Sequence, residues 1–328
     1  MKSSIIAGIG FAVLLGSLFF FLSERKSQFP KAISGDLYKE WQNWKIKYGK
    51  NYPSNDEEFF RINTFANNFK KINTHNSLPS KSYTMKVNQF ADLTAEEAQS
   101  LLLSRMPIPT SANENIGETP SITAPASWDW KKEKPGSIRR IRHQGMCGSC
   151  WAFSAIGAVE GISFIFKGIG DEFSEQQLID CSDSYGNKGC DGGWMTYAFG
   201  YIRDRGITTE KEYPYEGRDL PECKKQGGAF KISGFVNVAK GNVEALKTSI
   251  VAQPTSVGVD AQNWTFYDHG IFDDCYDDLN HGVLVYGYDQ NCWYVKNSWG
   301  EDWGEKGYIR LKMGNTCGIL TWPSYPKV

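Results

Sequence analysis

The pattern of apolar and polar residues divides the chain into three parts, and the first is an apolar run near the N-terminus. Residues 5–22 are 18 consecutive apolar, glycine or serine positions. The run is long for a signal-peptide core and about minimal for a membrane-spanning helix. Lys2 precedes it and three basic residues follow by position 31, a bias that alone would leave the rest of the chain in the cytosol. A cleaved signal and a retained anchor both stay open.

The second part is polar and has a helical spacing of apolar and aromatic residues. Trp41, Trp44 and Tyr48 lie at such a spacing. Six further residues follow at intervals of three or four, which places them on one helical face, where the first two can form an ion pair. They are Glu57, Arg61, Phe65, Asn68, Ile72 and Asn76. Between about 103 and 123 the chain turns rich in Pro, Ser, Thr and Asn, which is typical of an extended, easily cut segment.

The third part changes from helical to strand patterns along its length. Residues 151–213 are rich in helix, and 175–180 and 194–199 are two of its helical pieces. After Phe230, runs rich in Val, Ile, Tyr and Trp are separated by Gly and Asp, which predicts antiparallel strands. The fold class that follows is α+β.

Composition narrows the class of protein without identifying it. The chain has 328 residues, 41% of them hydrophobic, and a formal net charge of −1, so it is long enough for more than one core unit. It has no excess of basic residues, and we expect no nucleic-acid partner. Eight cysteines behind an apolar N-terminus favour the secretory route and disulfides. Since only Cys147 and Cys150 are closely spaced, we expect no zinc site, no other metal and no cofactor.

The segment 144–151, Gln-Gly-Met-Cys-Gly-Ser-Cys-Trp, carries the candidate chemistry. An apolar run begins there and predicts a buried helix starting at about Cys150. A helix N-terminus favours negative charge, so it lowers the pKa of a thiol and raises its thiolate fraction. Free backbone N–H groups and the amide of Gln144 can stabilise the oxyanion that forms when a carbonyl is attacked. Cys150 is therefore a candidate nucleophile.

A thiolate needs a proton carrier, and the chain has four histidines. His281 lies in residues 279–287, an apolar, strand-like run flanked by glycine, and we take it as the partner of the thiol. Asn297 is a natural orienting group, because its amide oxygen can accept a hydrogen bond from an imidazole. The alternatives are a hydrogen-bonded core histidine and an asparagine in a turn.

Together these residues resemble the papain and cathepsin family of cysteine proteases, and the cathepsin L group in particular. The Cys-Gly-Ser-Cys-Trp signature is that of the family, and His281 and Asn297 follow Cys150 by 131 and 147 residues, as expected there. The resemblance implies that Cys150 is the nucleophile, His281 the general base and then acid, and Gln144 an oxyanion donor. It implies a cysteine endopeptidase with a helical left domain and a β-barrel-like right domain, whose cleft separates Cys150 from His281.

The second part resembles the inhibitory propeptides of the cathepsin L group. The six spaced residues match the interrupted helix motif there, and Asn88, Phe90 and Asp92 match the short motif that follows, with Lys86 where Gly is usual. The resemblance implies a signal peptide or anchor at 1–23, a propeptide at 24–123 and a mature enzyme at 124–328. The mature part has a net charge of −4 and the part before it +3, so protonation of carboxylates would loosen their attraction. We expect a zymogen that is activated by propeptide loss at acidic pH.

The family pattern also assigns the cysteines. It joins Cys147 to Cys190, Cys181 to Cys223, and Cys275 to Cys317, and leaves Cys150 free. Cys292 stands where the family has an ordinary strand residue, and we expect a buried free thiol there.

The same resemblance gives a substrate-binding set. Gly192 and Gly193 would let a peptide backbone approach closely. Trp322 stands where the family often has Ala, Ser or Glu, so it should shorten the pocket for the substrate's second residue and favour medium aliphatic side chains over Phe or Arg. The pocket set implied by position is Trp194, Met195, Gly258, Leu279, Gly282 and Trp322.

Other expectations complete the sequence-based description. Asn263 begins a glycosylation sequon, and Asn280 and Asp289 replace residues that are common in the family. The expected partners are protein or peptide substrates, the chain's own propeptide as an intramolecular inhibitor, and cystatin-like inhibitors. If the N-terminal apolar run is retained as an anchor, a membrane is a further partner. The expected location is a lysosome, a vacuole or the cell exterior.

Two alternative functions are a non-catalytic binding relative and an exopeptidase. The first is disfavoured because all four catalytic residue types are present, and the second because no cleft-blocking segment is evident.

Overall fold

The computed structural model describes residues 35–107 and 122–328, so the apolar run 5–22 and much of the linker lie outside the described residues. Tertiary contacts divide the chain into two compact units, Met1–Ala66 and Asn67–Val328, and the division falls within one helix. In the described ranges, one helix, Cys150–Lys167, is long and apolar enough to cross a membrane. That helix is 72% buried inside the fold, which is typical of a core helix.

The first unit is helical. It contains α1 (Gly35–Tyr48) and the first half of α2 (Asn55–Ser77). Trp41 and Trp44 stack with their ring centroids 5.2 Å apart, and Phe65 meets the Trp41 ring edge-on at 5.3 Å. These three aromatic side chains are buried, so the helical spacing in the sequence marks a small aromatic core.

The described rest of the expected propeptide lies in the second unit, where asparagines of α2 form hydrogen bonds with the backbone of the chain that follows. Asn68 donates its amide to the carbonyls of Ala91 and Leu93, both at 2.9 Å. Asn76 exchanges two hydrogen bonds with the backbone of Met85, at 2.8 and 2.9 Å. The chain then forms strand β1 (Tyr83–Met85) and helix α3 (Ala95–Leu102), which a Thr94–Glu97 capping box begins.

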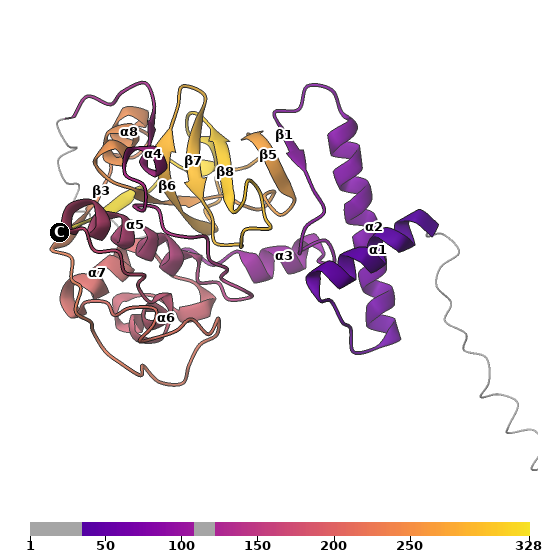
Figure 1. Cartoon of the computed structure of the whole chain (residues 1–328), viewed down its shortest axis with the longest axis horizontal. Helices are drawn as coiled ribbons and strands as arrows, with labels where there is room; N and C mark the ends of the chain where they lie inside the picture. Colours follow the sequence, from indigo (N-terminus) through magenta and orange to yellow (C-terminus); the bar gives the residue numbers. More distant parts are fainter. Residues whose placement is uncertain (1–34, 108–121) are drawn as a thin grey trace, which may run out of the picture. The chain divides into compact units, whose positions relative to one another are not determined.

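Four helices and two short 3₁₀ turns build the helical lobe of the second unit. Helix α5 (Cys150–Lys167) is apolar on nearly every face and is therefore buried, and it ends at Gly168, whose φ of 66° suits glycine. Figure 1 shows α5 between strand β6 and helices α6 and α7. The remaining elements are α4 (Trp130–Glu133), α6 (Glu175–Cys181), η2 (Asp183–Tyr185), η3 (Gly189–Asp191) and α7 (Met195–Arg205).

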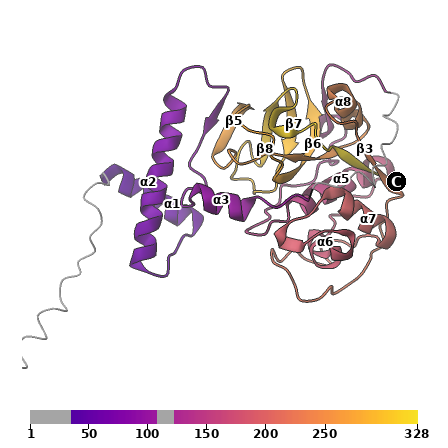
Figure 2. The same ribbon diagram turned by 180° about the vertical axis from the view of Figure 1, so that it is seen from behind.

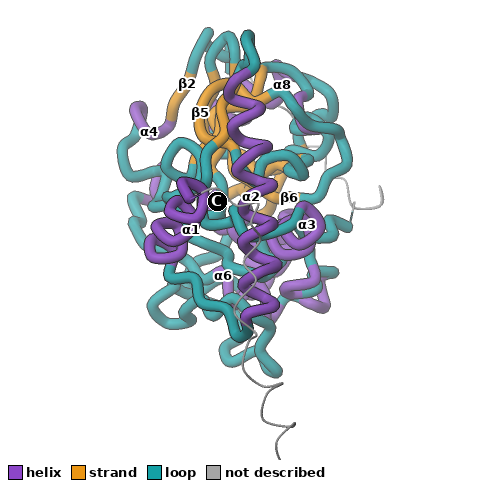
Figure 3. Tube along the Cα trace, turned by 90° about the vertical axis from the view of Figure 1, so that its right-hand side faces the viewer, coloured by secondary structure: helices purple, strands orange, loops and turns teal. Residues whose placement is uncertain are grey.

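Nine strands form the other lobe, in the order β1-β5-β8-β7-β6-β4-β9-β3, with β2 added beside β6. Figures 2 and 3 show these strands gathered apart from α6. All pairs are antiparallel except β5 with β8, which are parallel, so the expectation of antiparallel strands is right for all but one pair. The elements not yet bounded are β2 (Trp128–Asp129), β3 (Gly234–Asn237), α8 (Val243–Ala252), β4 (Thr255–Val259), β5 (Tyr267–Phe272), β6 (His281–Tyr288), β7 (Cys292–Lys296), β8 (Tyr308–Lys312), η4 (Thr316–Gly318) and β9 (Ser324–Lys327).

Three disulfides hold these lobes, and they are the pairs that the resemblance implied. Two join segments of the helical lobe, and one joins a loop of the strand lobe to η4. The bridges are Cys147–Cys190, Cys181–Cys223 and Cys275–Cys317. Cys150 and Cys292 are free and buried.

Candidate active site

The candidate nucleophile Cys150 is the first residue of α5 and is fully buried. Its sulfur accepts a hydrogen bond from the backbone N–H of Gly282 at 3.2 Å. Gly282 directly follows His281, the first residue of β6, so the end of a helix and the start of a strand meet at the sulfur. The fold therefore brings together two residues that are 131 positions apart in the sequence.

The imidazole of His281 is held by three neighbours. Its Nε2 lies 2.7 Å from the Oδ1 of Asn297, which also accepts the N–H of Ser298 at 2.8 Å. Since that oxygen is an acceptor, Nε2 carries the proton in the neutral ring. The rings of Trp299 and Trp264 lie 4.9 and 6.0 Å away, centroid to centroid. Nδ1 is buried and has no hydrogen-bond partner within the described residues, which leaves its lone pair free for a proton.

Gln144 is buried, and its side-chain amide is fully used. Its Nε2 donates to the carbonyl oxygens of Leu102 at 3.1 Å and of Cys147 at 3.0 Å. Its Oε1 accepts from the hydroxyl of Ser298 at 2.6 Å, which fixes the orientation of the amide. The donor that the sequence assigned to an oxyanion thus points at a peptide carbonyl.

The peptide at this donor belongs to the segment that the resemblance assigns to the propeptide, and this segment runs past the thiol in extended form. The Ser104 hydroxyl lies 3.2 Å from the sulfur of Cys150, and the Ser104 N–H donates to the Asn280 carbonyl at 2.9 Å. The next residue, Arg105, forms a parallel β-bridge with Gly192. The segment therefore covers the sulfur.

Burial decides the protonation of the pair in this state. It raises the pKa of the Cys150 thiol, although hydrogen bonds from Ser104 and Gly282 oppose the change. It lowers the pKa of His281 to about 4, against the effect of its hydrogen bond with Asn297. The backbone N–H groups of Cys150 and Trp151 at the helix N-terminus lower the thiol pKa, as expected, but in the covered site the loss of solvent outweighs them and the net change is a rise. Thiol and imidazole are both neutral here.

The two glycines assigned to peptide binding have different surroundings. A Cβ placed on Gly192 would lie 2.1 Å from the carbonyl oxygen of Arg105, so a side chain there would block the extended segment. A Cβ on Gly193 would instead meet Asn187 at 2.4 Å and the Trp151 ring at 2.7 Å. Gly192 thus permits close approach of a peptide, whereas Gly193 permits close packing inside the helical lobe.

The residues assigned to the specificity pocket mostly come together. A Cβ on Gly258 would lie 3.1 Å from the Trp194 ring and 3.4 Å from Leu279. Met195 belongs to the same apolar cluster as Trp194, with Leu279 and Trp322 packed against it. Gly282 differs, because a Cβ there would meet the backbone of Trp151 at 3.1 Å. Because Gly282 has no side chain, β6 can pack closely against α5.

The same apolar cluster contains a residue of the expected propeptide that sequence reasoning did not single out. Met106 is 8% exposed and is a member of the cluster of Trp194 and Met195. It directly follows Arg105, which pairs with Gly192. Ser104, Arg105 and Met106 therefore follow the cleft from the thiol towards the pocket.

A group of buried charged side chains lines the same small cavity as Asn297. Arg142 forms an ion pair with Glu175 at 2.6 Å and a second with Glu160. Lys296, which precedes Asn297, lines a small cavity of about 20 Å³ with these three side chains, and burial lowers its pKa to about 8. Sequence reasoning missed this group, although Glu160 and Lys296 stand inside otherwise apolar runs. In the ranges 35–107 and 122–328 no group of three or more His, Cys, Asp or Glu side chains could hold a metal ion.

A thiol at a helix N-terminus, beside an imidazole held by an amide and between a helical and a strand lobe, defines a papain-type cysteine protease. The family model described as "Papain family cysteine protease" matches residues 124–327, and the model described as "Cathepsin propeptide inhibitor domain (I29)" matches 41–98. The chain belongs to the papain family of cysteine proteases.

Individual relatives narrow the type. Cathepsin L 2 of Paramecium tetraurelia is 40% identical over 295 residues, covering 89% of this chain and 93% of the relative. Cathepsin S of Bos taurus is 41% identical over 311 residues, with the same coverage of 89% and 93%. The structure of digestive procathepsin L 3 of Tenebrio molitor larval midgut aligns with a TM-score of 0.82 and 38% identity, covering 90% of this chain and 100% of the other. The chain is a cysteine endopeptidase of the cathepsin L type with an inhibitory propeptide, as the sequence predicted.

Proposed function

We propose that Cys150 is the nucleophile, His281 the proton carrier, Asn297 its orienting group and Gln144 the oxyanion donor of this endopeptidase. The observation that carries the proposal is the covering of these atoms by the chain's own segment. Ser104 contacts the sulfur of Cys150, and the Leu102 carbonyl takes the amide of Gln144. An inhibitor that occupies the places of a reacting peptide supports catalytic roles for the residues beneath it.

The geometry suggests the order of events in the uncovered site. Nδ1 of His281 takes the thiol proton, and the sulfur attacks the carbonyl carbon of the substrate. The N–H groups of Gln144 and of the helix N-terminus stabilise the oxyanion. The imidazolium then protonates the leaving amine, and water hydrolyses the acyl-enzyme with His281 as the base. Asn297 holds the ring in one orientation through these steps.

Removal of the propeptide would shift Cys150 and His281 from their neutral forms to their charged forms. Water reaching the sulfur and the ring reverses the desolvation that raises the pKa of Cys150 and lowers that of His281. The helix N-terminus then favours the thiolate. The propeptide is therefore proposed to act in two ways: it blocks access to the site, and it keeps the thiol of Cys150 in its neutral form.

We assign residues 1–23 to a signal peptide or membrane anchor, 24–123 to the propeptide and 124–328 to the mature enzyme. Acidic pH is the proposed trigger of propeptide loss. The support is electrostatic, since Lys86 pairs with Asp268 at 3.1 Å, and Ser82 donates to Asp273 at 2.6 Å. Acid protonates carboxylates and so weakens such contacts between propeptide and enzyme.

The proposed substrates are proteins with a medium aliphatic residue before the residue at the scissile bond. Trp322 packs against the apolar cluster that contains Trp194 and Met195, so its indole takes up space at this pocket. Met106, an unbranched apolar side chain of medium size, is buried in the same cluster. We further propose a location in a lysosome, a vacuole or outside the cell, with cystatin-like proteins as inhibitors and a glycan at Asn263.

The deciding experiment is acid activation of the purified precursor, followed by labelling with an epoxide that alkylates active-site thiols. We expect one label per molecule, on Cys150, and cleavage inside folded proteins. The Cys150→Ala precursor should take no label and stay uncleaved, whereas Cys292→Ser should behave as the wild type. Labelling of Cys292 alone, or no labelling after propeptide loss, would contradict the assignment.

A further inference from the structure

The propeptide covers a second surface besides the cleft, at the end of the sheet. Strand β1 pairs antiparallel with β5, with Tyr83 opposite Gly270 and Met85 opposite Tyr267. Beyond these pairs, the Ile271 N–H donates to the Ser82 carbonyl at 2.8 Å. The other side of β5 pairs with β8. Loss of β1 therefore leaves β5 as an edge strand with free backbone donors and acceptors, which readily bind another extended chain.

This edge has an aromatic site beside it. The ring of Tyr83 is 3% exposed and lies 4.6 Å from that of Phe272 and 6.3 Å from that of Tyr267, centroid to centroid. These two enzyme rings are themselves fully buried in the zymogen. Departure of Tyr83 opens an apolar surface that an aromatic residue of another chain can fill.

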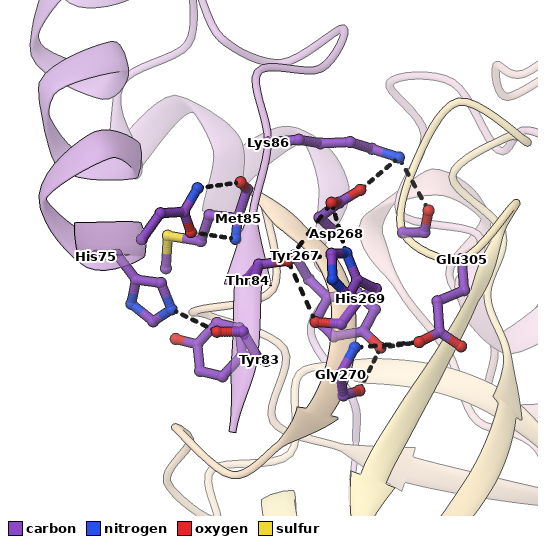
Figure 4. A network of polar contacts seen from close by, with 12 residues as sticks. His75, Tyr83, Thr84, Met85, Lys86, Tyr267, Asp268, His269, Gly270 and Glu305 are labelled. Atoms are coloured by element: carbon purple, nitrogen blue, oxygen red, sulfur yellow. Dashed lines mark hydrogen bonds and ion pairs between the residues drawn. The ribbon is translucent and has the colours of Figure 1, made fainter. Parts of the chain in front are cut away.

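The edge is also acidic, and propeptide donors meet each of three carboxylates. Ser82 donates to Asp273 at 2.6 Å, and the Tyr83 hydroxyl donates to Asp274 at 3.1 Å. Lys86 lies 3.1 Å from Asp268 and also donates to the Gly304 carbonyl at 2.9 Å (Figure 4).

Other charged groups of the enzyme do not neutralise this edge. His269 lies 2.8 Å from Asp268, and Lys312 lies 3.5 Å from Asp273. Glu305 is paired with Arg310. Without Lys86, the three aspartates face solvent with one weak lysine contact and one histidine, so the edge carries net negative charge and favours a cationic partner.

We infer that the edge of β5 is a second binding surface of the mature enzyme for protein substrates. The segment that it takes is extended and has an aromatic residue followed, three residues later, by lysine or arginine. The inference rests on the proposed function, because the edge is free only after the propeptide leaves. Its residues differ from those around Cys150, so one substrate chain can engage both places and gain from the raised local concentration.

The test uses the mature wild-type enzyme and a reporter of two folded domains joined by a flexible linker. The linker contains one cleavage sequence and, on the order of 20 residues away, the sequence of residues 82–86 (Ser-Tyr-Thr-Met-Lys). A matched reporter has Ser in place of Tyr and Glu in place of Lys. We expect a KM at least about fivefold lower for the first reporter and equal kcat values.

Enzyme variants assign the effect to Asp268. In Asp268→Asn the advantage of the first reporter over one in which only Lys is changed to Glu should largely disappear, while hydrolysis of a dipeptide amide stays unchanged. The Asp268→Lys variant should show the opposite preference: it should have a lower KM for a reporter in which only Lys is changed to Glu than for the first reporter. Asp171→Asn, which alters an exposed carboxylate before α6, should leave the advantage intact.

A second measurement needs no variant. A capped peptide of residues 82–86 should abolish the reporter's advantage without slowing cleavage of the dipeptide amide. The inference is overturned if the two reporters have equal KM, or if the advantage survives in Asp268→Asn and resists the peptide. Failure to hydrolyse the dipeptide amide would instead contradict the proposed catalytic residues.

Discussion

The side-chain amide nitrogen of Gln144 lies 3.1 Å from the main-chain carbonyl oxygen of Leu102. The zymogen thus places one of its own peptide carbonyls where the proposed mechanism needs the substrate's oxyanion. Beside it, the Ser104 hydroxyl, rather than a carbonyl carbon, meets the sulfur of Cys150 at 3.2 Å. The proposed oxyanion donor is therefore occupied in the zymogen, and the sulfur contacts a hydroxyl group, so both groups are blocked for a substrate.

Substitution of Gln144 should lower the rate of chemistry more than it lowers substrate affinity. For mature Gln144→Ala we expect kcat to fall about 100-fold, with KM little changed, because the lost donor acts on charge that develops in the transition state. Steady-state kinetics on a dipeptide amide measures both constants. Ser298→Ala, which removes only the hydroxyl that orients the amide, should cost less. Equal losses in kcat and in affinity would argue for a structural role.

The buried neutral imidazole should make the precursor sensitive to acid. The pKa of His281 is about 4 in the folded state, below its ordinary value of 6.5. A base with a lowered folded-state pKa stabilises the fold above its unfolded pKa, and that stability is lost as the pH falls from about 6.5 to about 4. The loss is on the order of 3 kcal/mol.

Urea unfolding of the Cys150→Ala precursor across this pH range checks the prediction. The variant that also carries His281→Gln should show a shallower decline, since glutamine takes up no proton. Carboxylates contribute equally to both proteins, so the difference between the two curves isolates the histidine. Parallel curves would show that His281 is not desolvated in the folded precursor.

The ion pair between Lys86 and Asp268 should set part of the pH at which the precursor becomes active. Both side chains are partly exposed, at 33% and 28%, so the pair contributes at most about 1 kcal/mol. Lys86→Met should move half-activation slightly towards neutral pH, because less acid is needed to loosen the contact. A pH series of propeptide release measures the shift, and Lys39→Met, in α1, is the control. Activation only at lower pH in Lys86→Met would refute the role.

Trp322 should limit the size of the preferred side chain in the specificity pocket. The wild-type enzyme should cleave dipeptide amides with Val or Leu at this position faster than those with Phe. In Trp322→Ala the ratio of kcat/KM for Phe over Val should rise about tenfold, because the indole no longer takes up space at the pocket. Faster cleavage of Phe substrates by the wild type would show that Trp322 does not shorten the pocket.

Local sequence accounts well for the elements that carry the site. The apolar run after Cys150 predicts α5 from about its first residue, and the run 279–287 predicts a strand that the structure has as β6, His281–Tyr288. Both segments are long and nearly uniform in pattern, so no distant contact is needed to recognise them. The parallel pairing of β5 with β8 was not predictable, since no local pattern distinguishes the partners of a strand.

The departures from the family pattern show where sequence reasoning stops. No role could be given to Asp289 from the sequence. In the structure its carboxylate accepts the N–H groups of Asn291 and Cys292, at 2.7 and 2.9 Å, and the hydroxyl of Tyr294 at 2.9 Å. It therefore closes the turn between β6 and β7. Burial raises the pKa of the Cys292 thiol to about 12, and the negative charge of Asp289 is the second cause of this rise.

The sequence by itself determined the kind of chemistry, because the thiol with its glycines and helix, the imidazole in its strand and the propeptide motif are each written in short stretches of chain. Only the tertiary structure decided the state of that chemistry. The protonation of Cys150 and His281 depends on burial, and the side chains packed against them come from elsewhere in the chain: Ser104 lies against the thiol, and Trp264 and Trp299 lie beside the imidazole. A pKa reflects everything that surrounds a group, whereas a motif records only its neighbours along the chain.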